Sequence, residues 1–305
     1  MRLPKGSLRS HAQTDSAYTA PMLLHPFFDG LRPTLLIAHR GGAAIAPENT
    51  SLAFSIAVDA FHADMLEIDV HLSRDGVLVV SHDPTLERCT DGEGTIAEHL
   101  WAELQRLDAG YRFTRDGGVT FPFRGTGLRL PRLDQVLADH PNVRFNIELK
   151  ANQPGAAEAL ADVIRQASAT YRVCLGSEHD DLAARLVSAI PDACFFYPRA
   201  LLTNLVMALR TNAPWSWQEP YLVLDVPLEH AGTRIVDHAL LRAAEAAGRW
   251  VNVWTVDDTA QMRDLADLGV GGIMTDRPDL LRETLDAPRQ QRRSDVEVPS
   301  SAFGR

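Results

Sequence analysis

The sequence predicts an α/β fold, a (β/α)8 TIM barrel with a small insertion after the second barrel strand. Two observations support this prediction. Eight short apolar runs alternate with segments of helical periodicity between residues 34 and 275, which is typical of a parallel barrel. Polar and charged residues also gather where these runs end, at the face on which barrel enzymes carry their sites.

Each expected strand is a short apolar run bounded by polar or turn-forming residues. The expected strands are Thr34–His39, Met65–Val70, Val143–Lys150, Val173–Ser177, Cys194–Tyr197, Tyr221–Val226, Trp250–Val256 and Gly271–Thr275. Segments with apolar residues at helical spacing lie between most of them. The expected helices are Ser51–Phe61, Leu133–Asp139, Ala156–Ala169, Asp181–Ile190, Leu201–Arg210, Arg234–Ala247 and Ala260–Leu268.

One apolar run, Val77–His82, breaks the alternation. It follows Arg74-Asp75-Gly76, and Asp-Gly is a strong hairpin signal. An antiparallel return from the second strand would bring His82 back to the level of Asp69. We therefore assign this run to an insertion, about 71–130, whose glycine-rich later part is expected to be loop.

The barrel domain is expected to span residues 33–286. Residues 1–32 are mixed and polar, and predict a partly ordered leader on the surface. Residues 287–305 are charged and aperiodic, which predicts a disordered tail.

Composition limits the classes of partner. The chain has 305 residues, 45% hydrophobic content and a net charge of −10 with no basic run, so nucleic acid and anionic membranes are disfavoured as partners. The odd number of cysteines, without zinc-site spacing, suggests a reducing compartment. We find no signal peptide and no run of membrane-spanning length. These features predict a cytoplasmic protein without a stable membrane anchor, and they point to no particular oligomeric state.

Three carboxylates predict a metal site. Glu67, Asp69 and Glu148 lie near the carboxyl ends of two apolar strands, and residues two apart on a strand share a face. Buried carboxylates are usually paired or bind a metal. Three carboxylates with no sulfur ligand nearby favour Ca²⁺ or Mg²⁺.

Two histidines and a few neighbours complete the candidate site. His39 and His82 each end an apolar run and are suited to general acid and base roles because imidazole titrates near neutral pH. Arg40 is a candidate ligand for a phosphate oxygen. Lys150 stands out because Lys5 is the only other lysine, and arginine does not replace a compact ammonium group at a tight site.

Three other residues each have two interpretations. Trp254 is interpreted either as an apolar wall for a small ligand or as core packing. Asp225 is ambiguous in the same way. Glu48 lies in a helix-start sequence but could still reach the site.

These motifs, in this order, resemble the glycerophosphodiester phosphodiesterase family. The resemblance covers residues 34–282 and rests on His39-Arg40-Gly41, Pro47-Glu48-Asn49-Thr50, Glu67-Ile68-Asp69-Val70, Asp75-Gly76, His82-Asp83, Leu130-Pro131-Arg132-Leu133, Glu148-Leu149-Lys150, Trp254-Thr255-Val256 and Gly269–Pro278. It implies metal ligands at the three carboxylates and catalysis by the two histidines. The chain departs from the family pattern at Arg132, Asp257 and Gly271, away from those residues.

The resemblance implies metal-dependent hydrolysis of a small glycerophosphodiester to sn-glycerol 3-phosphate and an alcohol. One alternative keeps the site and changes the substrate to a lysophospholipid, as in a lysophospholipase D, with Phe113, Phe121 and Phe123 as the candidate apolar rim. A second alternative is a non-catalytic barrel that binds metal or phosphate. The presence of both histidines, all three acids and the lysine disfavours it.

Overall fold

The structure is a computed structural model that describes residues 25–287. The chain outside this range includes the predicted tail from 288 onward and most of the predicted leader. Eight parallel strands form the barrel, and the barrel closes because β1 pairs with both β11 and β2. The barrel strands are β1 (Leu35–His39), β2 (Met65–Leu72), β4 (Arg144–Leu149), β5 (Val173–Gly176), β6 (Cys194–Phe196), β7 (Tyr221–Pro227), β10 (Trp250–Trp254) and β11 (Gly272–Thr275). The (β/α)8 prediction is confirmed.

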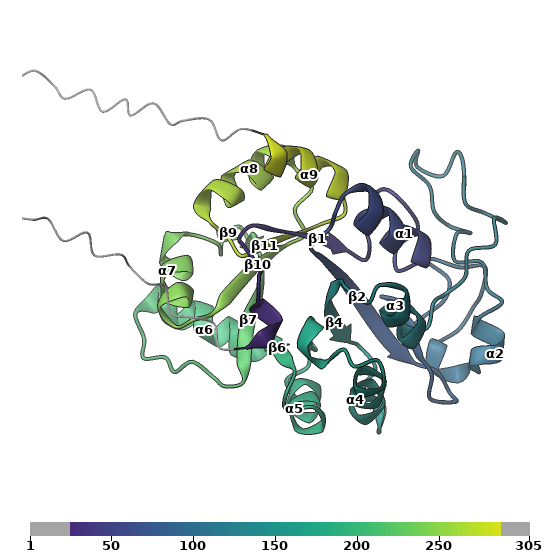
Figure 1. Ribbon diagram of the computed structural model, residues 1–305, viewed down its shortest axis with the longest axis horizontal. Coiled ribbons are helices and arrows are strands. Elements are labelled where there is room, and N and C mark those ends of the chain that lie inside the picture. The colour runs from purple at the N-terminus through teal and green to yellow at the C-terminus, as the bar shows by residue number, and fades with distance from the viewer. Residues whose placement is uncertain (1–24, 288–305) are drawn as a thin grey trace, which may run out of the picture.

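Helices surround the barrel and follow most of its strands (Figure 1). They are α1 (Ser51–Ser55) with its π-helical continuation η2 (Ile56–Ala60), α3 (Leu133–Asp139), α4 (Ala156–Gln166), α5 (Asp180–Ala189), α6 (Arg199–Thr211), α7 (His238–Ala246), α8 (Thr259–Leu268) and α9 (Pro278–Asp286). The sequence did not predict α9. No helix within residues 25–287 is long and apolar enough to cross a membrane.

One helix begins later than predicted. The segment expected to be helical from Arg234 instead opens with a small hairpin of β8 (Glu229–His230) and β9 (Thr233–Arg234). Asp237 then caps α7 by accepting a hydrogen bond from the backbone N–H of Leu240 at 2.9 Å. A capping aspartate fixes where a helix starts more firmly than apolar spacing does.

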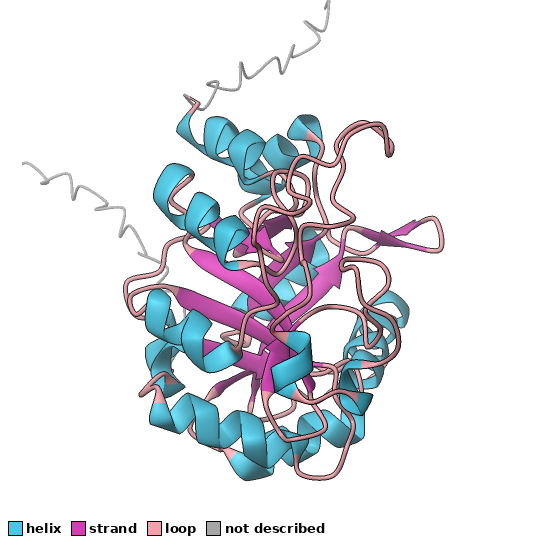
Figure 2. Cartoon of the chain, turned by 90° about the vertical axis from the view of Figure 1, so that its right-hand side faces the viewer, coloured by secondary structure: helices cyan, strands magenta, loops and turns pink. Residues whose placement is uncertain are grey.

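The predicted hairpin after the second strand is confirmed. β3 (Leu78–Val80) runs antiparallel to β2, with Val70 opposite Val80. Figure 2 views the barrel from the side of the insertion, with long loops in front of the strands. The rest of the insertion contains only η3 (Ile96–Glu98) and α2 (Trp101–Leu104) before α3. Its residues 111–129 form neither helix nor strand, as their glycine content predicted.

The barrel interior is layered from bottom to top. Phe27 and Phe28, in the short η1 helix (Pro26–Phe28), are buried against Leu35 and Met65 at the amino end of the barrel. This part of the leader therefore closes the barrel rather than lying on its surface. Outward-facing strand residues such as Ile68 pack in a separate cluster against the helices.

A polar layer lies above this apolar floor. The Asn146 side-chain amide donates to Asp225 across the barrel at 2.7 Å, and the Asn252 amide donates to the other oxygen of Asp225 at 2.8 Å. The Asn146–Asp225 bond joins the non-adjacent strands β4 and β7, and the Asn252–Asp225 bond joins the neighbouring strands β10 and β7. Asp225 thus belongs to the barrel interior, beneath the candidate site.

Candidate active site

The predicted carboxylates and His39 meet at the carboxyl end of the barrel. Strand register places His39 opposite Glu67 and Asp69 opposite Glu148. Glu67 and Asp69 are buried, with 7% and 2% of their surfaces exposed. The sequence therefore located these four residues correctly relative to one another.

A turn after β1 shapes one wall of the site. Gly41 and Gly42 both have positive φ angles, and an added Cβ would lie 2.8 Å from Ala53 or Pro278, respectively. Only glycine fits such a turn without strain. The turn directs the backbone N–H of Arg40 to the carboxylate of Glu67 at 3.0 Å.

His39 is held between two carboxylates. Its Nδ1 lies 2.6 Å from Asp276 Oδ1, and its Nε2 lies 3.9 Å from Glu67 Oε2. Burial opposes protonation, but the hydrogen bond to Asp276 and the charge of Glu67 together raise the pKa of His39 above its usual 6.5. The two carboxylates therefore favour the protonated form of His39 more than water does for a free histidine.

Asp276 is a site residue that the sequence analysis did not single out. It follows directly after β11, and its backbone N–H and the Thr275 hydroxyl both donate to Asp257, at 2.8 and 2.9 Å. Its position after the last barrel strand was the available signal. Asp257, one of the departures from the family pattern, thus supports the partner of His39.

Glu67 and Asp69 form a crowded carboxylate pair. Burial, followed by the charge of Asp69, raises the pKa of Glu67 to about 8. Asp69 accepts a hydrogen bond from the Asn49 side-chain amide at 3.1 Å, and Arg40 Nε lies 3.5 Å from it. These neighbours therefore do not offset the burial of the Glu67 carboxylate.

Lys150 lies between the carboxylates of two strands. Its Nζ is 2.9 Å from Glu148 Oε2 and 3.4 Å from Asp69 Oδ1. Burial lowers the pKa of Lys150, but Asp69 and Glu148 more than offset this and raise it above the usual value. The ammonium group is therefore charged, and it shares the strand face of Glu148 as predicted.

The three carboxylates are neighbours but do not form a coordination shell. Within residues 25–287, no three His, Cys, Asp or Glu side chains are grouped so as to hold a metal ion. Glu148 uses its oxygens to accept from the Lys150 ammonium at 2.9 Å and from the backbone N–H of Glu178 at 3.2 Å. The structure thus brings the predicted ligands to one place without arranging them around one point.

The hairpin brings His82 to the same end of the barrel. The backbone N–H of Ser81 donates to the carbonyl of Asp69 at 3.0 Å, so the register predicted from the Asp-Gly turn is correct. His82 Nδ1 lies 2.6 Å from Asp83 Oδ1. Partial burial would raise the pKa of Asp83, but hydrogen bonds from Arg88 and His82 lower it to about 2.

A chain of ion pairs joins the hairpin to the barrel. Arg88 donates a hydrogen bond to Asp83. It also donates two hydrogen bonds to the Glu48 carboxylate, of 2.6 and 2.8 Å. Glu48 in turn accepts from Arg40 at 3.1 Å. The link therefore runs from His82 to Arg40 through Arg88, which the sequence analysis missed, and through Glu48, which it named only as able to reach the site.

Trp254 lies at the carboxyl end of the barrel. Trp254 ends β10 and is 43% exposed, which disfavours the core-packing interpretation.

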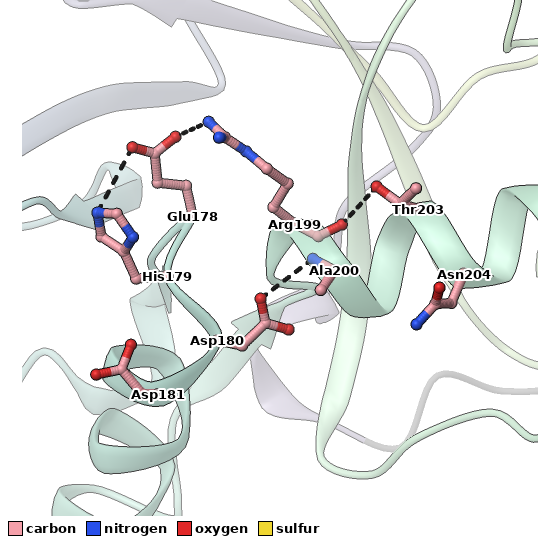
Figure 3. A pocket seen from close by; sticks show the side chains of 8 residues that line it. All are labelled: Glu178, His179, Asp180, Asp181, Arg199, Ala200, Thr203 and Asn204. Carbon is pink, nitrogen blue, oxygen red and sulfur yellow. Dashed lines mark hydrogen bonds and ion pairs between the residues drawn. The ribbon is translucent and has the colours of Figure 1, made fainter.

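A hollow of about 520 Å³ lies between the starts of α5 and α6 (Figure 3). It adjoins the site because the backbone N–H of Glu178, which lines it, donates to Glu148. Its acids are already engaged, because Glu178 pairs with Arg199 and Asp180 accepts from the first backbone N–H groups of α6.

Comparison with known proteins decides the family. The model of the glycerophosphoryl diester phosphodiesterase family matches residues 39–280. The chain belongs to this family. Membership makes the protein an enzyme, a phosphoric diester hydrolase.

Individual members of the phosphodiesterase family agree with this assignment. A glycerophosphodiester phosphodiesterase of Caldanaerobacter subterraneus is 33% identical, covering 81% of this chain and 96% of the relative. The crystal structure of a glycerophosphodiester phosphodiesterase from Agrobacterium tumefaciens has a TM-score of 0.65 and 28% identity, over 82% and 99% of the two chains. An Oleispira antarctica phosphodiesterase in complex with sn-glycerol-3-phosphate shares the fold, with a TM-score of 0.63 and 24% identity, over 84% and 98%.

Proposed function

We propose that this phosphodiesterase hydrolyses glycerophosphodiesters to sn-glycerol 3-phosphate and an alcohol, with His39 and His82 as the acid–base pair. One observation carries the proposal. Two histidines, each tethered to a carboxylate through Nδ1, flank the buried Glu67–Asp69 pair at the barrel mouth. The product bound to the Oleispira phosphodiesterase supports the expected product.

The charges around His39 support one assignment of the two histidine roles. His39 has a raised pKa, so it is suited to donate a proton from Nε2 to the leaving alkoxide as the P–O bond breaks. His82 then accepts the proton of the attacking hydroxyl, which belongs to water or to the glycerol of the substrate. The acid acts on the leaving oxygen and the base on the attacking oxygen, and each increases the rate by about 100-fold or more.

A divalent metal is the usual cofactor of this family, and the carboxylates at the barrel mouth have the donor atoms that such an ion prefers. Carboxylate oxygens are the preferred ligands of Ca²⁺ and Mg²⁺, and the raised pKa of Glu67 indicates a pair that lacks positive charge. Glu67, Asp69 and Glu148 would hold the ion. When bound, it would polarise the phosphoryl oxygens.

Cationic side chains would position the substrate phosphate. Arg40 and Lys150 are both charged and both face the carboxylates, at 3.5 and 3.4 Å from Asp69. Their placement supports contacts with phosphoryl oxygens, where charge accumulates during the reaction. The exposed Trp254 side chain would cover an apolar part of the substrate.

We also propose a cytoplasmic location and a small-molecule substrate. Cys89, Cys174 and Cys194 are all unpaired, as is typical of a reducing compartment.

A lysophospholipase D activity is the second candidate. It uses the same residues and differs in requiring access to a lipid-borne substrate. The observation that favours it is the exposed insertion beside the mouth, where Arg115 binds the backbone carbonyl of Ile45. A non-catalytic barrel has less support, because both histidines retain their carboxylate partners.

The test is a turnover assay with glycerophosphocholine and with lysophosphatidylcholine, each with and without EDTA and after Ca²⁺ or Mg²⁺ is restored. We expect metal-dependent release of choline from glycerophosphocholine. Faster turnover of the lysophospholipid would support the second candidate. Turnover of neither substrate after metal is restored would contradict both enzyme proposals, and EDTA-resistant turnover would contradict the metal site.

A further inference from the structure

The insertion carries positive charge on an otherwise acidic protein. Residues 111–129, here called the basic loop, contain four arginines and one aspartate, a net charge of +3 in a chain of −10. In Figure 1 the blue-to-teal trace after α2 extends as long loops beyond α1, clear of the helices. The basic loop is therefore positively charged although the whole chain is negatively charged.

The arginines of the basic loop are not neutralised. Within residues 25–287, none of them lies within ion-pair distance of a carboxylate. Their hydrogen bonds go instead to backbone carbonyls, as from Arg112 to Thr90 at 3.4 Å and from Arg124 to Tyr111 at 2.9 Å. The four residues are Arg112, Arg115, Arg124 and Arg129. Their charges are thus available to an external anion.

Aromatic rings contact three of these four arginines, Arg112, Arg115 and Arg124. The Arg124 guanidinium lies 3.8 Å from the ring centre of Phe121 and 4.2 Å from that of Tyr111. Phe113 packs edge-on against Phe123 at 5.3 Å. Stacking of this kind is favourable, and it uses ring faces that nucleic-acid bases would otherwise need.

The tip of the loop presents an apolar side chain to solvent. Asp116 accepts hydrogen bonds from the backbone N–H groups of Val119 and Thr120 at 3.0 and 2.9 Å and so folds the tip. Val119 itself is 80% exposed. An exposed aliphatic residue in a loop that carries four arginines is suited to the boundary between lipid headgroups and acyl chains.

The basic loop also lies at the mouth of the site. Arg115 binds the carbonyl of Ile45, which follows the turn after β1. Arg112 reaches Thr90, two residues beyond Arg88 of the ion-pair chain. A surface bound by this loop would therefore lie near the turn after β1 and near the ion-pair chain that reaches Arg40.

We propose that the basic loop docks transiently on membranes that contain anionic phospholipid, which places the mouth of the site next to lipid-derived diesters. Uncompensated arginines supply the attraction to headgroup phosphates, and Val119 supplies a shallow apolar contact. This binding step is independent of the proposed chemistry, so each can fail without the other.

The test is sedimentation of the full chain with vesicles of phosphatidylcholine alone and of phosphatidylcholine with phosphatidylglycerol. We expect salt-sensitive binding to the anionic vesicles only. The variant Arg112→Gln/Arg129→Gln should bind about 30-fold more weakly, since each basic residue near an anionic surface contributes about fivefold. The matched control is Arg242→Gln/Arg263→Gln, which removes two exposed arginines from α7 and α8 and should bind as wild type does.

Further measurements separate the loop from general charge effects. Val119→Glu should also weaken binding, while turnover of soluble glycerophosphocholine should be unchanged in all three variants. The proposal is overturned if wild type ignores anionic vesicles or if the loop variant matches its control. Tighter binding to a single-stranded oligonucleotide than to vesicles would also overturn it.

Discussion

At the scale of single residues, the site depends on how two histidines are oriented. His39 and His82 each place Nδ1 2.6 Å from a carboxylate oxygen, of Asp276 and Asp83 respectively. Such a bond selects the tautomer and fixes the ring, leaving Nε2 for proton transfer. The two rings come from different elements, His39 from the end of β1 and His82 from the segment after β3.

We expect His39→Ala and His82→Ala each to lower kcat on glycerophosphocholine by about 100-fold or more, because each removes one proton-transfer group. Thermal melting should show little change, since both side chains are partly exposed at the mouth. The control is His238→Ala, which removes an exposed histidine at the start of α7. Near-wild-type turnover in either site variant would make that histidine structural.

We expect Lys150→Arg to reduce kcat/KM by about tenfold to 100-fold with little change in Tm, although the charge is kept. The ammonium lies 2.9 and 3.4 Å from two carboxylates, and a planar guanidinium is too large for that position. Steady-state kinetics and a melting curve measure the two effects. An arginine variant as active as wild type would reduce Lys150 to a general positive charge.

At the scale of elements, the hairpin and the barrel are connected by charge. The insertion carries Arg88, the segment between β1 and α1 carries Glu48, and their paired hydrogen bonds join the two. Since Arg88 also binds Asp83, the position of His82 depends on this contact. The insertion therefore contributes to the site as well as covering it.

We expect Arg88→Met to lower kcat by about tenfold, because His82 loses its anchored partner. The kcat of Arg88→Lys should lie between those of wild type and Arg88→Met, since lysine keeps the charge but not the two hydrogen bonds to Glu48. Arg88 is 44% exposed, so the loss of stability should stay near 1 kcal/mol.

The matched control for this bridge is Arg132→Met. Arg132 makes a similar two-bond contact with Asp134 and is 42% exposed, but it does not touch the histidines. Its kcat should stay near that of wild type. Equal losses in both methionine variants would show that the bridge has no positioning role.

At the scale of the whole molecule, closure of the barrel buries polar groups beneath the site. Asp225 accepts hydrogen bonds from Asn146 and Asn252 across the interior. Burial is the main reason that its pKa is raised to about 6, although the two amides lower it. The native fold therefore holds the proton of Asp225 more tightly than the unfolded chain does.

This shift predicts a specific dependence of stability on pH. A carboxyl group whose pKa is raised by folding stabilises the fold fully below its unfolded value, near 4, and loses that contribution as pH rises through about 6. We expect Tm to contain a component that falls between about pH 4 and pH 7, and Asp225→Asn to remove it. The control is Asp267→Asn on exposed α8. Identical pH profiles in wild type and Asp225→Asn would contradict the assignment.

The sequence by itself determined the barrel and much of its site. Alternating apolar runs predicted the eight strands because a parallel strand that is buried on both faces is largely apolar. The two-residue strand period placed Glu67 and Asp69 on one face, and the Asp75-Gly76 turn predicted the level of His82. All of these patterns are local, because each depends only on residues that are close together in the sequence.

Only the tertiary structure decided which distant residues complete the site. Asp276 reaches His39 across 237 positions of sequence, and Arg88 reaches Glu48 across 40. Phe27 and Phe28 close the barrel floor by packing with residues that are also distant in sequence, such as Met65. These contacts exist because β1 pairs with β11 and the insertion folds back over the mouth, and ring closure is a property of the whole chain that no local pattern encodes.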